Sequence, residues 1–470
     1  MQYFKPERAD QFVGDAMPFW SNGRYHLYYL VDENHHHGLG GMGGHQWAHA
    51  STTDLVHWER HPMALSLGEA GSYDDGSICT GSLFEHEGTY YAFYAGRSRD
   101  SAGNKIETVC LATSPDAIHF TKHPGNPIIV PGPMYQPADF RDPNVFLADD
   151  GLFHMLVTTR LSDEPVAGRG GCLAHLTSCN LVAWEYAEAF LTPGMCPYPE
   201  CADYFQWNDW YYVIYLGPWG RNHYRMSRNP FGPWLRPAVD TLDGRWLAAM
   251  KTAAFGPAGE RRIGVGFLPC REGGRDDGGG QYAGNAVFRE IVQNPDGALS
   301  SKFPAEMAPA TGEFITARVT ALSGDVAGDA ASTLTLADPE GLSMAAFEGI
   351  PADARIRMRV TPSASAREFG LVVRGAGRCE TGYEVRFIPA EKRVRVKPVA
   401  KGEDITHSLQ GVEGLDRPFS IELVMTGDIL DLCIDERMCF VNRYGEARGD
   451  RLFLFCENGE VTFEGLQIMY

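Results

Sequence analysis

This sequence lacks the features of secreted and membrane-spanning chains. No window approaches about 18 uninterrupted apolar residues, so we expect no membrane span. No charged and then apolar leader precedes the opening MQYFKPERADQF, so we expect no secretion signal. The 11 cysteines are odd in number and include no Cys-x-x-Cys pair. This pattern predicts reduced thiols in a cytoplasmic protein rather than a disulfide framework.

Positive charge is also scarce. Lysine and arginine number 41 against 60 acidic residues, which gives a formal net charge of -19. Binding to phosphate backbones or anionic lipid surfaces needs clustered basic residues, so neither a nucleic acid nor a membrane is an expected partner.

The residues that are abundant favour strands and turns. The chain has 53 glycines, 25 phenylalanines, 20 tyrosines and 9 tryptophans. Aromatic side chains fit pleated surfaces and glycines fit turns, so we expect an all-β protein. A chain of 470 residues is too long for one ordinary core, so two domains are expected.

An internal repeat organises the first three hundred residues. Short β-type runs led by a turn begin at Gly23, Gly88, Gly151, Asp209 and Arg261. A second series follows in step, with a strand, a Ser/Thr/Asp turn and an aromatic strand, and begins at Ala50, Ala112, Leu176, Arg225 and Asn285. Two strand pairs per unit predict a five-bladed β-propeller over residues 1–304. A string of hairpins in a β-sandwich is the alternative.

The pattern changes after Pro304. Residues 305–345 are rich in Ala, Gly, Ser and Thr, and we interpret them as a connector with edge strands. From residue 346 to residue 470 short alternating runs return between Gly, Asp and Pro turns. Their spacing predicts a C-terminal β-sandwich domain.

One residue stands four positions before an aromatic ahead of each of the five runs. These residues are Asp15, Thr80, Asp142, Glu200 and Lys251. The first strand of every propeller blade lines the central channel, so equivalent positions on these strands should converge. Three of the five are carboxylic acids, and their clustering would raise at least one pKa, as a general acid requires.

Two carboxyl groups that flank a glycosidic bond suffice for its hydrolysis, so glycoside chemistry is the natural hypothesis. Each acid also has a structural interpretation. Asp142 precedes Pro143 as in a common turn, Glu200 could lie in a surface loop, and Asp15 could cap a turn. Only their shared position favours a site.

Three motifs resemble those of glycoside hydrolase family 32, the invertase, inulinase and levanase family. FVGDAMPF holds the place of the family's nucleophile motif, FRDP resembles its Arg-Asp-Pro motif, and PECADYF resembles its Glu-Cys acid/base motif. HQWAHASTTDLVHWERHPMAL, GSICTGSLF and DGRWLAAMKTAAF resemble family segments in the same order. The resemblance spans nearly the whole chain and implies a five-bladed propeller followed by a β-sandwich.

The resemblance also implies roles. Asp15 would be the nucleophile and Glu200 the general acid and then base of a retaining mechanism. Asp142 and Arg141 would grip ring hydroxyls of the sugar. Trp47 and Ser82 match substrate contacts of the family, and His45 and Lys251 complete the set of candidate substrate-binding residues.

Two departures from the family pattern fall on sugar-binding positions. Gly14 replaces the asparagine before the nucleophile, with loss of the following Pro-Asn, and Leu30 replaces a glutamine. The three acids remain, so the resemblance leaves the reaction type in place and implies altered specificity.

Metal sites and cofactors are not expected. His35, His36, His37 and His45 lie close together in sequence, but no cysteine or paired carboxylate completes a tetrahedral set. We interpret them as a loop at the mouth of the first blade, with metal as a minor alternative. Asp276 and Asp277 could bind calcium, but two acids are a weak signal, and a mobile rim is the preferred interpretation.

These observations predict a cytoplasmic retaining glycosidase that acts on terminal β-D-fructofuranosides of small saccharides, with a possible homodimer contact on the sandwich. An inverting arabinofuranosidase or xylosidase of a related five-bladed family, a fructosyl transferase and a non-catalytic carbohydrate-binding propeller are the alternatives.

Overall fold

The computed structural model describes residues 3–35, 42–192, 194, 198–307, 315, 318–329, 332–401 and 405–470. Every regular element in these ranges is a β-strand or a short 3-10 helix, which confirms the all-β class. The 3-10 helices are η2 (Pro218–Gly220), η3 (Glu272–Gly274), η4 (Ala305–Met307) and η5 (Pro389–Glu391). None of the helices in the described part of the chain is long and apolar enough to cross a membrane.

The chain divides into two compact units. The first comprises Met1–Thr241, Leu247–Pro269 and Gln281–Leu299, and the second comprises Leu242–Trp246, Cys270–Gly280 and Ser300–Tyr470. Two short segments between residues 242 and 280 therefore group with the C-terminal residues. The predicted connector at 305–345 contains strands that pair within the sheet of the second unit. Whether the ranges 1–304, 305–345 and 346–470 act as domains stays a prediction.

The first unit consists of antiparallel sheets that succeed one another along the chain. Its strands are β1 (Tyr3–Phe4), β2 (Gln11–Ser21), β3 (Arg24–Glu33), β4 (Gln46–Thr52), β5 (Glu59–Arg60), β6 (Ser77–His86), β7 (Thr89–Arg99), β8 (Lys105–Ser114), β9 (Thr121–Lys122), β10 (Tyr135–Leu147), β11 (Phe153–Leu161), β12 (Gly171–Ser178), β13 (Glu185–Tyr186), β14 (Glu200–Trp207), β15 (Trp210–Leu216), β16 (Asn222–Ser227), β17 (Ala248–Phe255), β18 (Arg261–Arg271) and β19 (Gly280–Gln293). Strand β20 (Leu299–Lys302) pairs with β19, and its residues from Ser300 onward belong to the second unit. The predicted turn-led runs form β3, β7, β11, β15 and β18.

Tight turns connect the first two strands of several sheets. Asn22 and Gly23 join β2 to β3 with φ angles of 50° and 73°. Glu87 and Gly88 join β6 to β7 with φ angles of 51° and 77°. Two successive positive φ angles are those of the hairpin turn whose twist matches the strands, which explains the glycines that begin these runs.

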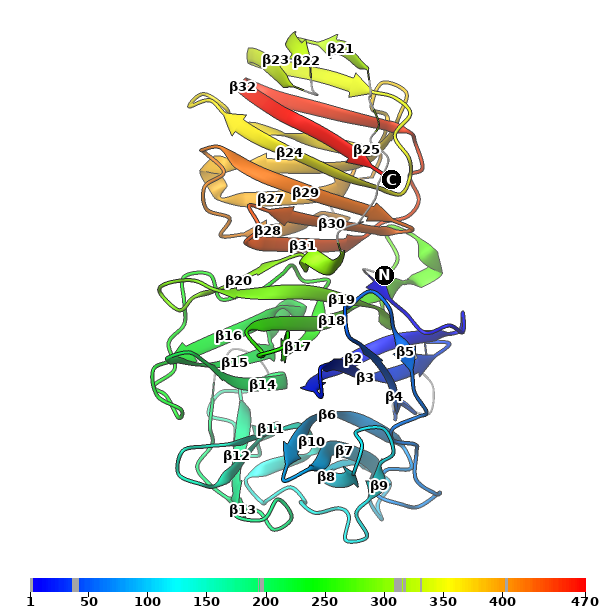
Figure 1. The fold of residues 1–470 in the computed structure, drawn as a ribbon, viewed down its shortest axis with the longest axis vertical. Coiled ribbons are helices and arrows are strands. Elements are labelled where there is room, and N and C mark those ends of the chain that lie inside the picture. The colour runs from blue at the N-terminus through cyan, green and yellow to red at the C-terminus, as the bar shows by residue number, and fades with distance from the viewer. Residues whose placement is uncertain are drawn as a thin grey trace. The chain divides into compact units, whose positions relative to one another are not determined.

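Neighbouring sheets of the first unit pack face to face (Figure 1). Trp47 and Tyr28 pack with Ile78 and Tyr94, which joins the β2–β5 strands to the β6–β9 sheet. Further apolar clusters join β6–β9 to β10–β13, β10–β13 to β14–β16, and β14–β16 to β17–β18.

The last strands of the first unit pair with its first strands. Strand β19 pairs with β2 at Gly284 and Val13, so β17–β19 and β2–β5 form one sheet. The hydroxyl of Tyr25 on β3 donates to the carbonyl of Ile263 on β18 at 3.2 Å. Figure 1 shows the strands of this unit arranged around a common centre.

The second unit is one continuous twelve-stranded sheet. Its strands are β21 (Val319–Ser323), β22 (Asp325–Asp329), β23 (Thr333–Phe347), β24 (Ala354–Pro362), β25 (Glu368–Ala376), β26 (Thr381–Ile388), β27 (Arg393–Pro398), β28 (His407–Gln410), β29 (Phe419–Thr426), β30 (Ile429–Ile434), β31 (Met438–Arg443) and β32 (Arg451–Met469). The long strand β32 pairs with β25 along its first part and with β24 along its second part.

The strands that pair with the two parts of β32 enclose the main apolar core of this unit. Ile356, Met358 and Val360 of β24 alternate with more exposed residues and point to the same interior as Leu371 and Val373 of β25. Alternation with a period of two is what a strand covered on one face requires. The arrangement is consistent with the predicted β-sandwich.

Candidate functional site

The strands β2, β6, β10, β14 and β17 share a β-bulge of the same kind, and β10 has a further irregularity between Tyr135 and Phe140. At each bulge two residues oppose a single residue of the neighbouring strand, and the bulged pairs are 14–15, 79–80, 142–143, 201–202 and 249–250. A bulge bends the strand and redirects its side chains, and Asp142 and Cys201 have φ angles of 57° and 54° there. The repeated bulge therefore positions the polar residues of these strands.

The predicted common register of the five candidate residues is wrong in detail. Glu200 is the last paired residue before its bulge and Asp142 is the first bulged residue. Asp15 and Thr80 are the second bulged residues, and Lys251 follows its bulge. The spacing to an aromatic residue did not reveal this offset because the bulge lies at a different distance from that aromatic residue on different strands.

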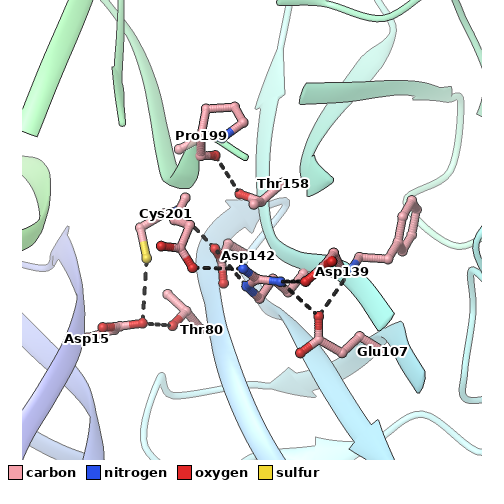
Figure 2. A network of polar contacts seen from close by, with 12 residues as sticks. Asp15, Thr80, Glu107, Asp139, Asp142, Thr158, Pro199 and Cys201 are labelled. Atoms are coloured by element: carbon pink, nitrogen blue, oxygen red, sulfur yellow. Dashed lines mark hydrogen bonds and ion pairs between the residues drawn. The ribbon is translucent and has the colours of Figure 1, made fainter. Parts of the chain in front are cut away.

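The three acids nevertheless meet through Cys201, the residue after Glu200. Cys201 donates its backbone N–H to Asp142 Oδ2 at 2.9 Å and its thiol to Asp15 Oδ2 at 3.5 Å (Figure 2). Its side chain is buried against Ala249 and Phe267, as expected for a residue packed between sheets. One residue thus places the carboxyl groups of three strands side by side.

Arg141 lies at the centre of a buried ion network. Its guanidinium donates to Glu200 Oε1 at 2.7 Å, to Asp139 Oδ1 at 3.0 Å and to Glu107 Oε2 at 3.1 Å. Figure 2 shows Glu107, Asp139 and Asp142 in this network of polar contacts. Glu107 has no exposed side-chain surface, so Arg141 supplies much of the charge that permits its burial.

The environment shifts the pKa values of two of the acids. Desolvation raises the pKa of Glu200, and the charge of Asp142 adds to this effect while Arg141 opposes it. Desolvation also raises the pKa of Asp142, with Asp15 adding to the effect and Arg141 opposing it. These shifts favour protonated carboxyl groups, and the Glu200 side chain is 32% exposed and accessible to a ligand.

Asp15 is held from three sides. Thr80 donates its hydroxyl to Asp15 Oδ2 at 2.5 Å, beside the thiol of Cys201. The backbone N–H of Asp15 donates to the hydroxyl of Tyr282 on β19 at 3.1 Å. Thr80, predicted only as one of the converging residues, is therefore a direct neighbour of the proposed nucleophile.

Three further residues predicted to contact the substrate, Trp47, Ser82 and Lys251, are buried. Trp47 is fully buried and donates its indole N–H to the carbonyl of Cys79 at 2.9 Å. Ser82 accepts the N–H of Val145 at 3.3 Å, and Lys251 donates to the carbonyl of Ala202 at 2.5 Å. Trp47 thus contacts β6, which carries Thr80, whereas Ser82 and Lys251 contact the acid-bearing strands β10 and β14. The roles of all three as substrate contacts stay predictions.

The histidines are only partly described. His36 and His37 lie outside the described residues. His45 contacts Asp32 through Nε2 at 3.1 Å, and His35 Nδ1 lies 3.0 Å from the carbonyl of Tyr282. No group of three or more His, Cys, Asp or Glu side chains within the described ranges could hold a metal ion.

The acidic segment after Gly273 is more ordered than its composition predicted. Asp276 is buried and accepts a hydrogen bond from the hydroxyl of Tyr383 at 2.9 Å and from the backbone N–H of Gly445 at 2.8 Å. Asp277 pairs with Arg275 at 2.9 Å. A mobile rim is therefore the wrong interpretation for Asp276, because protein donors already satisfy its carboxylate.

Sequence reasoning missed Glu107, Asp139 and Tyr282. Asp139 lies two residues before Arg141 in the same polar stretch, which was an available signal. Glu107 lies on β8 and Tyr282 on β19, and no motif around either residue connects it to the acids.

Comparison with known proteins gives one family. Residues 13–230 match the model described as the N-terminal domain of glycosyl hydrolases family 32. A sucrose-6-phosphate hydrolase of Zymomonas mobilis is 36% identical over 172 residues, which cover 36% of this chain and 32% of that protein. The match thus spans about a third of that relative's length.

Solved structures extend the likeness in fold to nearly the whole chain. A sucrose-6-phosphate hydrolase from Lactobacillus gasseri has a TM-score of 0.72 at 16% identity, over 98% of this chain and 93% of that one. A variant of fructan 1-exohydrolase IIa from Cichorium intybus, in complex with 1-kestose, has a TM-score of 0.71 at 16% identity, over 99% and 97% of the two chains. At this identity the likeness concerns the fold.

Proposed function

Because the chain belongs to glycosyl hydrolase family 32, we propose that it is a retaining glycosidase that releases fructose from terminal β-D-fructofuranosides of small saccharides. The observation that carries the proposal is the meeting of Asp15, Asp142 and Glu200 around Cys201. Relatives that match include a sucrose-6-phosphate hydrolase and, at 30% identity over 240 residues, a raffinose invertase of Escherichia coli.

Asp15 is the proposed nucleophile and Glu200 the proposed acid/base. Glu200 protonates the glycosidic oxygen while the Asp15 carboxylate attacks the anomeric carbon, so that the leaving alcohol departs and a fructosyl ester forms. Glu200 then removes a proton from water, which attacks the ester and releases the sugar with its original configuration. Arg141 and Asp142 bind ring hydroxyls near the bond that breaks.

The raised pKa of Glu200 supports this division of roles. A general acid must hold its proton near working pH, and desolvation together with the nearby Asp142 favours the protonated form. Asp15 accepts hydrogen bonds from Thr80 and Cys201, which hold its Oδ2 in place for attack on the anomeric carbon.

Several finer features belong to the same proposal. The repeated bulges and the sheet-to-sheet packing support a five-bladed propeller for residues 1–304, followed by a connector and a sandwich at 346–470. His45, Trp47, Ser82 and Lys251 complete the substrate-binding set. We also propose a cytoplasmic location, in keeping with an odd cysteine count that includes no Cys-x-x-Cys pair, and a homodimer.

The test is sugar release from sucrose, sucrose 6-phosphate, short inulin and levan oligosaccharides and arabinofuranosides, by the wild type beside Asp15→Asn and Glu200→Gln. We expect fructose from at least one fructoside and a loss of about 100-fold or more in each variant. NMR of the first product formed distinguishes retention from inversion. Arabinose release, inversion of configuration or full activity of either variant would contradict the proposal.

A further inference from the structure

Tyr282 occupies the space beside Gly14 that a side chain at position 14 would fill. A Cβ atom built on Gly14 would lie 2.4 Å from the Tyr282 hydroxyl oxygen and 2.8 Å from Cε1 and Cζ of its ring. These distances are shorter than real Cβ contacts. Gly14 immediately precedes Asp15, so the absence of its side chain brings a phenol to the proposed nucleophile.

Neighbouring groups hold the ring in this position. The ring packs against His45 at 5.0 Å and against Phe267 at 5.1 Å, measured between ring centroids. The Tyr282 carbonyl lies 3.0 Å from His35 Nδ1, and the next residue, Ala283, has a φ of 67°. A non-glycine residue at positive φ is uncommon, so the backbone that directs Tyr282 toward β2 is an unusual conformation held by its surroundings.

Among the described residues, the hydroxyl of Tyr282 acts as a hydrogen-bond acceptor and not as a donor. It accepts the backbone N–H of Asp15 at 3.1 Å, and no acceptor for its own proton is found among the described residues. A phenol has one donor, and a buried donor without a partner is costly. Burial and the nearby Asp15 raise the pKa of Tyr282 well above its ordinary value, so the proton is present at any working pH.

We propose that Tyr282 is a specificity-determining residue that donates its phenolic proton to a hydroxyl of the sugar seated against Asp15. The inference rests on the proposed function, since a sugar attacked by Asp15 must bring its anomeric carbon within about 3–3.5 Å of that carboxylate. The Tyr282 hydroxyl is 3.1 Å from the backbone nitrogen of the same residue. Substituents of that sugar ring therefore come within its reach.

Gly14 is needed for this position of the Tyr282 side chain. A side chain at position 14 could not coexist with Tyr282 in its present place, because both the hydroxyl and the ring carbons lie too close. Gly14→Ala should therefore displace the phenol. The double variant Gly14→Ala/Tyr282→Ala should recover the stability lost by Gly14→Ala, because the collision is gone, without recovering the sugar contact.

The experiment measures kcat/KM of Tyr282→Phe, which removes one oxygen atom and leaves the ring. Tyr212→Phe is the matched control, because it removes the same atom from a buried tyrosine whose hydroxyl bonds Gly297 and Gln293, at 2.6 Å each. Each variant is assayed on the fructoside that the wild type cleaves best and on analogues of it that each lack one fructosyl hydroxyl.

We expect Tyr282→Phe to lose about 10-fold or more in kcat/KM on the full substrate, and Tyr212→Phe to stay within about 2-fold. The loss should disappear on one deoxy analogue, the one without the hydroxyl that Tyr282 contacts. An equal loss on every analogue, or no loss on the full substrate, would overturn the inference. If the wild type releases no fructose from any substrate, it is the proposed function that fails instead.

Discussion

Replacing Arg141 with glutamine should weaken the fold and change the pH profile together. Arg141 is 8% exposed and bonds Glu200, Asp139 and Glu107 at 2.7–3.1 Å. Removing one partner of a buried ion network costs about 3–5 kcal/mol, because the opposite charges stay buried. For a unit of this size the loss corresponds to a Tm lower by about 6–20 °C.

The pH profile follows from the sign of the Arg141 effect. The positive charge of Arg141 lowers the pKa of Glu200, so its removal leaves that pKa higher than in the wild type. The acid form of Glu200 then persists to higher pH, and the alkaline limb of kcat/KM should move upward. Calorimetry and a kcat/KM profile between about pH 4 and 10 measure both effects.

Two control variants make the Arg141 experiment decisive. Arg141→Lys keeps a charge but not the planar fork, so both effects should be smaller. Arg8→Gln removes an exposed ion pair, with Arg8 60% exposed, and should leave the Tm nearly unchanged because solvent screens such a pair. An unchanged Tm in Arg141→Gln, or an alkaline limb that moves downward, would refute the assignment of Glu200 and of its partner.

Three further predictions follow from single contacts. Asp142→Asn removes a charge that raises the pKa of Glu200, so the alkaline limb should move to lower pH, and an upward movement would contradict the proposed coupling. Gly81→Ala would place a Cβ 1.8 Å from the Phe93 carbonyl oxygen, so urea titration should show a loss of about 1–3 kcal/mol or more, and an unchanged midpoint would exclude this close approach. Desolvation lowers the pKa of the buried His26 to about 4, against 6.5 in the unfolded chain. The contribution of neutral His26 to the free energy of unfolding is therefore fully present above pH 6.5 and should be lost as the pH falls toward 4. This pH-dependent contribution is about 3 kcal/mol. The dependence of Tm on pH should be weaker in His26→Gln than in the wild type.

Much of the fold was readable from local sequence. The turn-led runs predicted the strands β3, β7, β11, β15 and β18, because alternation of side chains and turn glycines are properties of a few adjacent residues. The three acids were also found, since each lies in a short polar motif. Patterns of a few adjacent residues were enough for these two conclusions.

The arrangement around the acids was not readable in this way. The bulges shift Asp15, Asp142 and Glu200 relative to one another by single residues, and a bulge depends on the pairing of two strands. Glu107 is 34 residues from Arg141 in sequence and Tyr282 is 267 residues from Asp15, yet both pairs are in contact. Such contacts exist only after the sheets have packed.

The sequence by itself therefore determined the all-β class, the order of the strands and the identity of the acidic residues, because these depend on local periodicity and residue type. Only the tertiary structure decided which groups form hydrogen bonds or ion pairs with those acids. The pKa values of Glu200 and Asp142 are set first by desolvation and then by charges from other strands, and both arise when distant segments come together and exclude water.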